Sequence, residues 1–71
     1  MKYEIGKEIF NNICAEAARR MISKAELQNA MGIRGSAFNQ RRKDPGLIRV
    51  SEIEGAAKLF HMKAKDLIER G

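Results

Sequence analysis

The 71-residue chain has no tryptophan and only one proline, one cysteine and one histidine. The single cysteine, Cys14, cannot form an internal disulfide, so the apolar core must hold the fold and we expect a reducing, cytoplasmic setting. The only histidine, His61, has no partner at metal-ligand spacing, and we expect no metal and no cofactor. Apolar runs stay well short of the roughly 18 residues of a membrane span, so we expect no membrane partner.

The sequence also lacks the residue sets on which common catalytic sites depend. No Ser-His-Asp arrangement can be traced. Gly6 and Lys7 lack the upstream glycine and the following Ser or Thr of a phosphate-binding loop. The first ten residues carry acids and contain no apolar stretch of the signal-peptide kind. We therefore expect a binding protein and no enzyme.

Helix-forming residues are plentiful, with 44% of the chain hydrophobic and 32% charged. Because Ala, Glu, Lys, Leu and Arg are common and β-branched runs are few, the chain is predicted to be all-α. Its length allows one domain, residues 1–71, with one small core. The spacing of apolar residues predicts a compact bundle of five short helices. Their expected ranges are about 4–21, 24–31, 35–43, 52–60 and 64–70.

Two signals support these ranges. Apolar residues recur at every fourth position of the first helix, which predicts one buried face made by Ile5, Ile9, Ile13, Ala17 and Met21. Capping boxes, in which a serine is followed three residues later by a glutamate, are expected at Ser23–Glu26 and Ser51–Glu54.

The stretch from Ser23 to Lys43 predicts two helices joined by a tight turn. Gly32 stands where a helix ends in a left-handed residue, a conformation that glycine adopts without strain. At about 100° per residue, Phe38 faces one side of the second helix and is predicted to be core. The other side is polar and hydrogen-bonding, and it carries Ser36, Asn39, Gln40 and Lys43. This pattern is typical of a central helix-turn-helix.

Positive charge is concentrated around the second of these helices. Between Arg34 and Arg49 the sequence has five cations and one acid, a net charge of +4 that leaves +1 for the rest of the chain. A local basic patch on a nearly neutral body favours a polyanionic partner.

The segments SKAELQNAMGI and SAFNQRRKDPGLIRVSEIEGAAKLFHMKAKDLIE carry a family resemblance. From Ile9 to Glu69 the chain resembles the lambda-repressor-like (Cro/XRE-type) helix-turn-helix proteins, in particular the small Cro-like regulators of phages and mobile elements. The resemblance implies that the helix starting near Gly35 lies in the major groove of double-stranded DNA. Proteins of this family often have an apolar residue where this chain has Arg41.

Site residues follow from this interpretation. Amide and lysine side chains pair with base edges in the major groove, and the residues expected to do so are Ser36, Asn39, Gln40 and Lys43. Cations around them are expected to contact the DNA backbone, and these are Lys24, Arg34, Arg41, Arg42 and Arg49. For Arg41 we expect an aliphatic stem on the core and a guanidinium on phosphate.

The expected function is therefore sequence-specific DNA binding as a small transcriptional regulator. One such domain reads only a few base pairs, so we expect a homodimer on a palindromic site. A different class of function stays open. The same basic face could bind an acidic protein surface, which would make the chain an interaction module such as an antirepressor or an adaptor.

Overall fold

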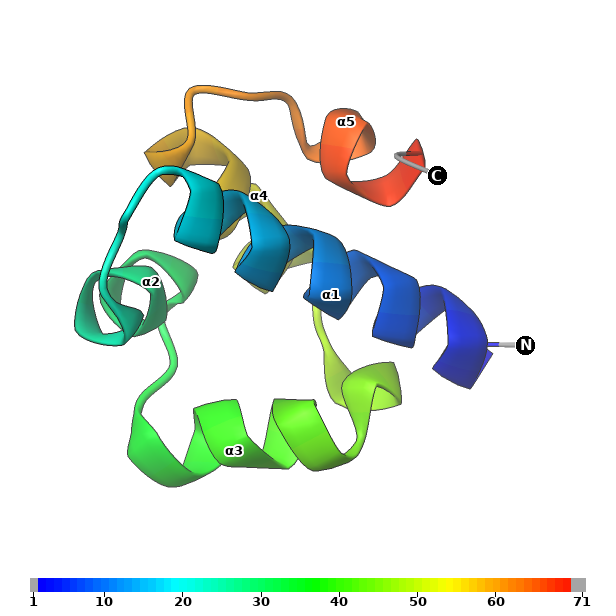
Figure 1. Ribbon diagram of the computed structural model, residues 1–71. Helices are drawn as coiled ribbons and strands as arrows, with labels where there is room; N and C mark the ends of the chain where they lie inside the picture. Colours follow the sequence, from blue (N-terminus) through cyan, green and yellow to red (C-terminus); the bar gives the residue numbers. More distant parts are fainter. Residues whose placement is uncertain (1, 70–71) are drawn as a thin grey trace.

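The computed structural model describes the backbone of residues 2–69 and the side chains of residues 6–69. It contains five α-helices and one short 3₁₀-helix, and no strand occurs in the described range (Figure 1). Their bounds are α1 (Lys2–Arg19), α2 (Lys24–Met31), α3 (Gly35–Lys43), η1 (Pro45–Leu47), α4 (Val50–Leu59) and α5 (Ala64–Glu69). The all-α, five-helix prediction is confirmed. The predicted core position of Ile5, and Arg70 at the expected end of the last helix, lie outside what is described.

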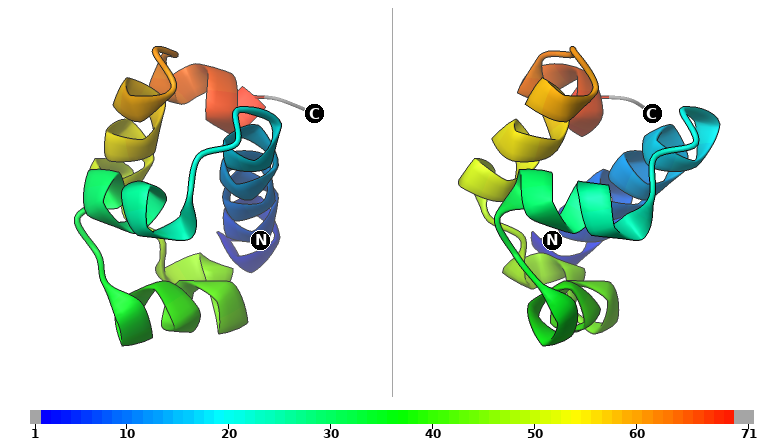
Figure 2. Two further views of the ribbon diagram at one scale, coloured as in Figure 1. Left: turned by 60° about the vertical axis from the view of Figure 1, so that its left-hand side comes forward. Right: turned by 90° about the vertical axis from the view of Figure 1, so that its left-hand side faces the viewer.

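The long helix α1 forms one side of the molecule in Figure 2, and η1, α4 and α5 pack against it. Helix α2 packs on α4, α5 packs on both α1 and α4, and η1 packs on α1. Helix α3 contacts η1 and lies at the opposite end of the molecule from α5 in every view (Figures 1 and 2). Because α3 lies at one end, most of its surface stays accessible.

One hydrophobic core joins all five helices. It consists of Ile9, Phe10, Ile13, Ala17, Leu27, Met31, Ile33, Phe38, Ile53, Ala56, Ala57, Phe60 and Leu67. Phe38 is the contribution of α3, and its ring centroid lies 5.4 Å from that of Phe10 on α1, with the ring planes at 50°. Tilted aromatic pairs at this separation add to the stability gained from burial alone. Phe38 therefore anchors α3 to the core, as its spacing predicts.

The two helices α2 and α4 approach each other closely enough for backbone to touch backbone. The contact point is Gly55 on α4, where an added Cβ would overlap the carbonyl oxygen of Ala30 and lie 3.2 Å from the Cα of Met31. Glycine at this position costs helix propensity. The close packing of α2 on α4 explains why the chain has no side chain there.

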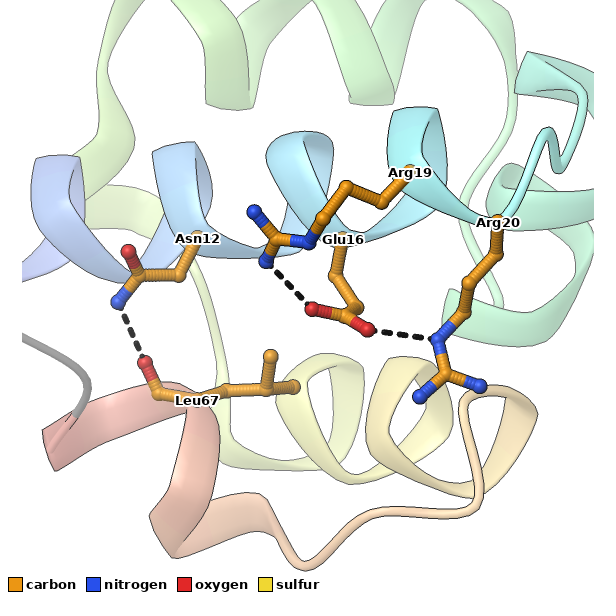
Figure 3. Close-up of polar contacts among 5 residues, drawn as sticks. All are labelled: Asn12, Glu16, Arg19, Arg20 and Leu67. Atoms are coloured by element: carbon orange, nitrogen blue, oxygen red, sulfur yellow. Dashed lines mark hydrogen bonds and ion pairs between the residues drawn. The ribbon is translucent and has the colours of Figure 1, made fainter.

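Polar side chains in the second half of α1 make two kinds of contact (Figure 3). Asn12 donates from Nδ2 to the carbonyl oxygen of Leu67 at 2.7 Å, which ties α5 to α1. The buried carboxylate of Glu16 accepts from Arg19 Nη2 at 2.6 Å and from Arg20 Nε at 2.7 Å. Arg19 and Arg20 are thus engaged with their own helix.

Helices α1, α2 and α4 end in the same way. In each, one N–H bonds three residues back and the next bonds five residues back, the pattern of a Schellman motif. The left-handed residue is Gly32 after α2 (φ 75°), Met21 after α1 (φ 57°) and His61 after α4 (φ 58°). The left-handed position predicted for Gly32 is confirmed. The core position predicted for Met21 is wrong, because α1 ends at Arg19 and the Met21 side chain is 92% exposed.

Replacing Met21 with glycine is expected to raise the free energy of unfolding by about 1 kcal/mol, because a left-handed conformation is strained for any residue with a Cβ. The exposed methionine side chain has little packing to lose. Urea denaturation of Met21→Gly and wild type measures the difference. Ala15→Gly, at an exposed site inside α1, is the matched control and is expected to destabilise by about 1 kcal/mol. A destabilised Met21→Gly would contradict the argument.

The start of α4 also differs from the prediction. The helix begins at Val50, and the carboxylate of Glu52 accepts a hydrogen bond of 3.0 Å from the N–H of Arg49. Ser51 is exposed within the first turn. The capping box predicted at Ser51–Glu54 is therefore wrong, whereas the box at Ser23–Glu26 is confirmed with both of its hydrogen bonds.

Candidate functional site

The outer surface of α3 is polar and open to solvent. Its exposed side chains include the four that the sequence predicts to contact bases, namely Ser36, Asn39, Gln40 and Lys43. At about 100° per residue they fall within one sector about 100° wide. Within residues 6–69, none of the four takes part in a side-chain hydrogen bond or an ion pair. The structure thus brings them together on one face, with their polar groups available to a partner.

The inner surface of the same helix is formed by two residues three positions apart. Phe38 is 2% exposed and packs in the core, and Arg41 is 9% exposed. The core contact of Phe38 fixes the rotation of α3 about its axis, because its ring meets Phe10. The polar sector opposite is consequently turned outward.

The sequence analysis expects the Arg41 guanidinium to reach outward, but the structure places it inside the protein. Its Nε donates to Glu52 Oε1 at 3.1 Å and its Nη2 donates to Glu52 Oε2 at 2.7 Å, a two-pronged ion pair between α3 and α4. Both side chains are buried. The expectation that the Arg41 guanidinium is held out for phosphate does not match this placement, and we leave Arg41 out of the candidate contacts.

Electrostatics keep this pair charged. Burial alone would raise the pKa of the Glu52 carboxyl, but the hydrogen bonds from Arg41 and from the Arg49 N–H, with the nearby positive charges, hold that pKa below its ordinary value. The hydrogen bond to Glu52 raises the pKa of Arg41, although burial acts against it. Glu52 therefore serves twice, as the partner of Arg41 and as an acceptor at the start of α4.

Four predicted cations are exposed, and they are Lys24, Arg34, Arg42 and Arg49. Lys24 Nζ lies 5.5 Å from the centroid of the Phe38 ring, and Arg42 Cζ lies 6.0 Å from the same centroid. Helix α3 has no acid in its first turn and carries Arg41, Arg42 and Lys43 in its last turn, which suits the helix dipole. With Arg41 paired with Glu52, four exposed cations and one exposed acid, Asp44, remain between Arg34 and Arg49.

The sequence does not identify Glu52 as the partner of Arg41. A signal was present, because Arg41 follows Phe38 by three residues and so lies on the buried side of α3. A buried arginine requires a carboxylate nearby, but the sequence alone does not say which of nine acids supplies it.

The described residues contain no group of three or more His, Cys, Asp or Glu side chains that could hold a metal ion. No helix in the same range is long and apolar enough to cross a bilayer. Comparisons of the chain with protein-family models, with curated proteins and with solved structures found no match.

Proposed function

We propose that this chain binds double-stranded DNA sequence-specifically, as a small transcriptional regulator of the phage or mobile-element type. Helix α3 enters the major groove, and α2 and α3 form the helix-turn-helix. The observation that carries the proposal is the outer face of α3, where two carboxamides, a hydroxyl and a lysine are exposed without partners in the described part of the chain. Carboxamides can pair with adenine and lysine with guanine.

The dimensions of α3 suit this role. An α-helix with its side chains fits the major groove. Its nine residues span about 14 Å, enough to present side chains to a few base pairs. The rotation fixed by Phe38 aims Asn39 and Gln40 away from the protein.

The surrounding cations supply the second half of the argument. Lys24 on α2, Arg34 before α3, and Arg42 on α3 can contact phosphates on either side of the groove, and such contacts set register without reading sequence. Arg49 extends the positive surface beyond η1. Neutralising about four phosphates makes the affinity fall steeply with salt. Two copies on a palindromic site extend the sequence read.

The first experiment selects duplexes from a random pool with the purified protein at two salt concentrations. An enriched sequence, bound more tightly than random DNA and more weakly at the higher salt, supports the proposal. Absence of duplex binding at low salt, with a stable complex to an acidic protein instead, would favour the interaction module.

Gln40→Ala is expected to weaken binding to the selected duplex by about 1–3 kcal/mol and to leave binding to random DNA nearly unchanged, because a base-reading contact is lost and no phosphate contact is. Fluorescence anisotropy on both duplexes measures this. Asn11→Ala, at an exposed carboxamide on α1, is the control and is expected to bind both duplexes like wild type. Equal losses on both duplexes from Gln40→Ala would mean that Gln40 does not read bases.

A further inference from the structure

A pocket with a volume of about 190 Å³ lies between α1, α2 and α3. Its wall is largely apolar, with Ala17 and Leu27 buried in the core beneath it and Cys14 contributing a half-buried thiol. Two charged residues complete the lining, Lys24 from α2 and Arg42 from α3. An apolar floor with two cations is the lining that an amphipathic anion requires.

The two cations approach the same aromatic ring. Each lies within 6.0 Å of the centroid of the Phe38 ring, one from α2 and one from α3. Neither forms an ion pair with a carboxylate of the described residues. Both residues line the pocket, and an anion bound there would be attracted to each of them.

The positive charge of Arg42 affects the ionisation of Cys14, which lines the same pocket. Burial raises the pKa of the Cys14 thiol, and the positive charge of Arg42 acts against that rise. The thiol and the guanidinium belong to α1 and α3, and both residues line the same pocket. A carboxylate held by Arg42 would place the rest of its molecule next to Cys14.

Size selects the ligand. An enclosed apolar cavity of about 150 Å³ holds one benzene molecule. This pocket is open to solvent on one side, and its volume has room for one ring whose small substituent points outward. We propose that the pocket binds a small aromatic carboxylate, with its ring against Ala17 and Leu27 and its carboxylate between Lys24 and Arg42.

Binding of such a ligand would regulate the chain, and this consequence rests on the proposed function. Lys24 and Arg42 are two of the cations assigned to DNA phosphates. A carboxylate bound between them neutralises part of that charge, so the ligand and DNA compete.

The site is tested without DNA, by the rate at which an uncharged maleimide modifies Cys14. Benzoate, benzyl alcohol and acetate are titrated against the wild-type protein at constant ionic strength. Benzoate is expected to slow modification saturably. Benzyl alcohol, which has the ring without the charge, is expected to need about tenfold higher concentration, as is benzoate with Arg42→Ala. Lys58→Ala, at an exposed lysine on α4, is the control and should respond like wild type.

If benzyl alcohol protected Cys14 at the same concentration as benzoate, the carboxylate contact would be overturned. If acetate protected Cys14 as well as benzoate does, the ring contact would be overturned. No protection by benzoate would overturn the site itself. None of these outcomes bears on whether the chain binds DNA.

The competition is then measured on the selected duplex with benzoate against the same concentration of acetate, which controls for ionic strength. Benzoate is expected to weaken DNA binding of wild type at least a few-fold, and to leave Arg42→Ala unaffected. Saturable benzoate binding without an effect on DNA would overturn the competition. Failure of the duplex to bind at all would count against the proposed function instead.

Discussion

Arg41→Met is expected to lower the free energy of unfolding by about 3–5 kcal/mol, because it leaves the buried Glu52 carboxylate without its partner. Arg42→Met, one position along the same helix, is expected to cost less than about 1 kcal/mol, since Arg42 is exposed, approaches the face of Phe38 and forms no ion pair with the described residues. A typical domain of this size has roughly 4–10 kcal/mol in total. The Arg41 variant should therefore lose a large part of its stability and unfold at a much lower urea concentration than wild type.

Urea denaturation near neutral pH measures both variants. The double variant Arg41→Met/Glu52→Met separates a broken ion pair from poor packing, because it removes both charges. It is expected to recover most of the stability that Arg41→Met loses. About 1 kcal/mol should stay lost, because the hydrogen bond from the Arg49 N–H to Glu52 is removed as well. If Arg41→Met and Arg42→Met cost the same, the buried pair would not be the contact that matters.

The same pair predicts a pH dependence. Because the native pKa of Glu52 lies below its ordinary value of 4.5, the unfolded state binds a proton more readily than the native state. The stability from this group is fully present above that ordinary value and is lost as the pH falls through the native pKa. As the pH falls from 4.5 to the native pKa of Glu52, the free energy of unfolding of wild type should fall more steeply than that of Arg41→Met/Glu52→Met. Parallel curves would contradict the assignment.

Gly55→Ala is expected to destabilise the protein by about 2–3 kcal/mol, although alanine is the better helix former. The added Cβ would overlap the carbonyl oxygen of Ala30, and backbone atoms cannot move aside as a flexible side chain can. Helices α2 and α4 would have to separate. Since α2 leads directly into α3, the variant is also expected to disturb the placement of the polar face.

Thermal and urea denaturation of Gly55→Ala test this, with Glu54→Ala as the control at an exposed site on the same helix. The control should change stability by no more than about 0.5 kcal/mol. A gain of about 1 kcal/mol from Gly55→Ala would match its helix propensity alone and would contradict the close packing of α2 on α4.

The sequence predicts the local structure of this chain well where the signals are local. Residues 24–31 and 35–43 are helical as predicted, because a capping serine, a turn glycine and apolar spacing all act within a few residues. The outward direction of Asn39 and Gln40 also follows from the helical period once Phe38 is taken as core. These features depend on neighbours in sequence.

Predictions that depend on contacts between distant segments fare worse. The partner of Arg41 is eleven residues away on another helix, and Glu52 is chosen by how α3 and α4 meet. Met21 continues the four-residue spacing, yet α1 has already ended in a left-handed turn that leaves this residue exposed. The pocket between α1, α2 and α3 likewise depends on how three helices pack, and no motif marks it.

The most direct test of the central claim is a titration of isotope-labelled protein with the selected duplex, followed by amide chemical shifts. The largest changes are predicted at residues 34–43, at Lys24 and at Arg49, with little change on α5 at the opposite end of the molecule. Changes centred on α5, or none at about 50 mM salt where phosphate contacts are strong, would contradict the claim that the outer face of α3 binds DNA.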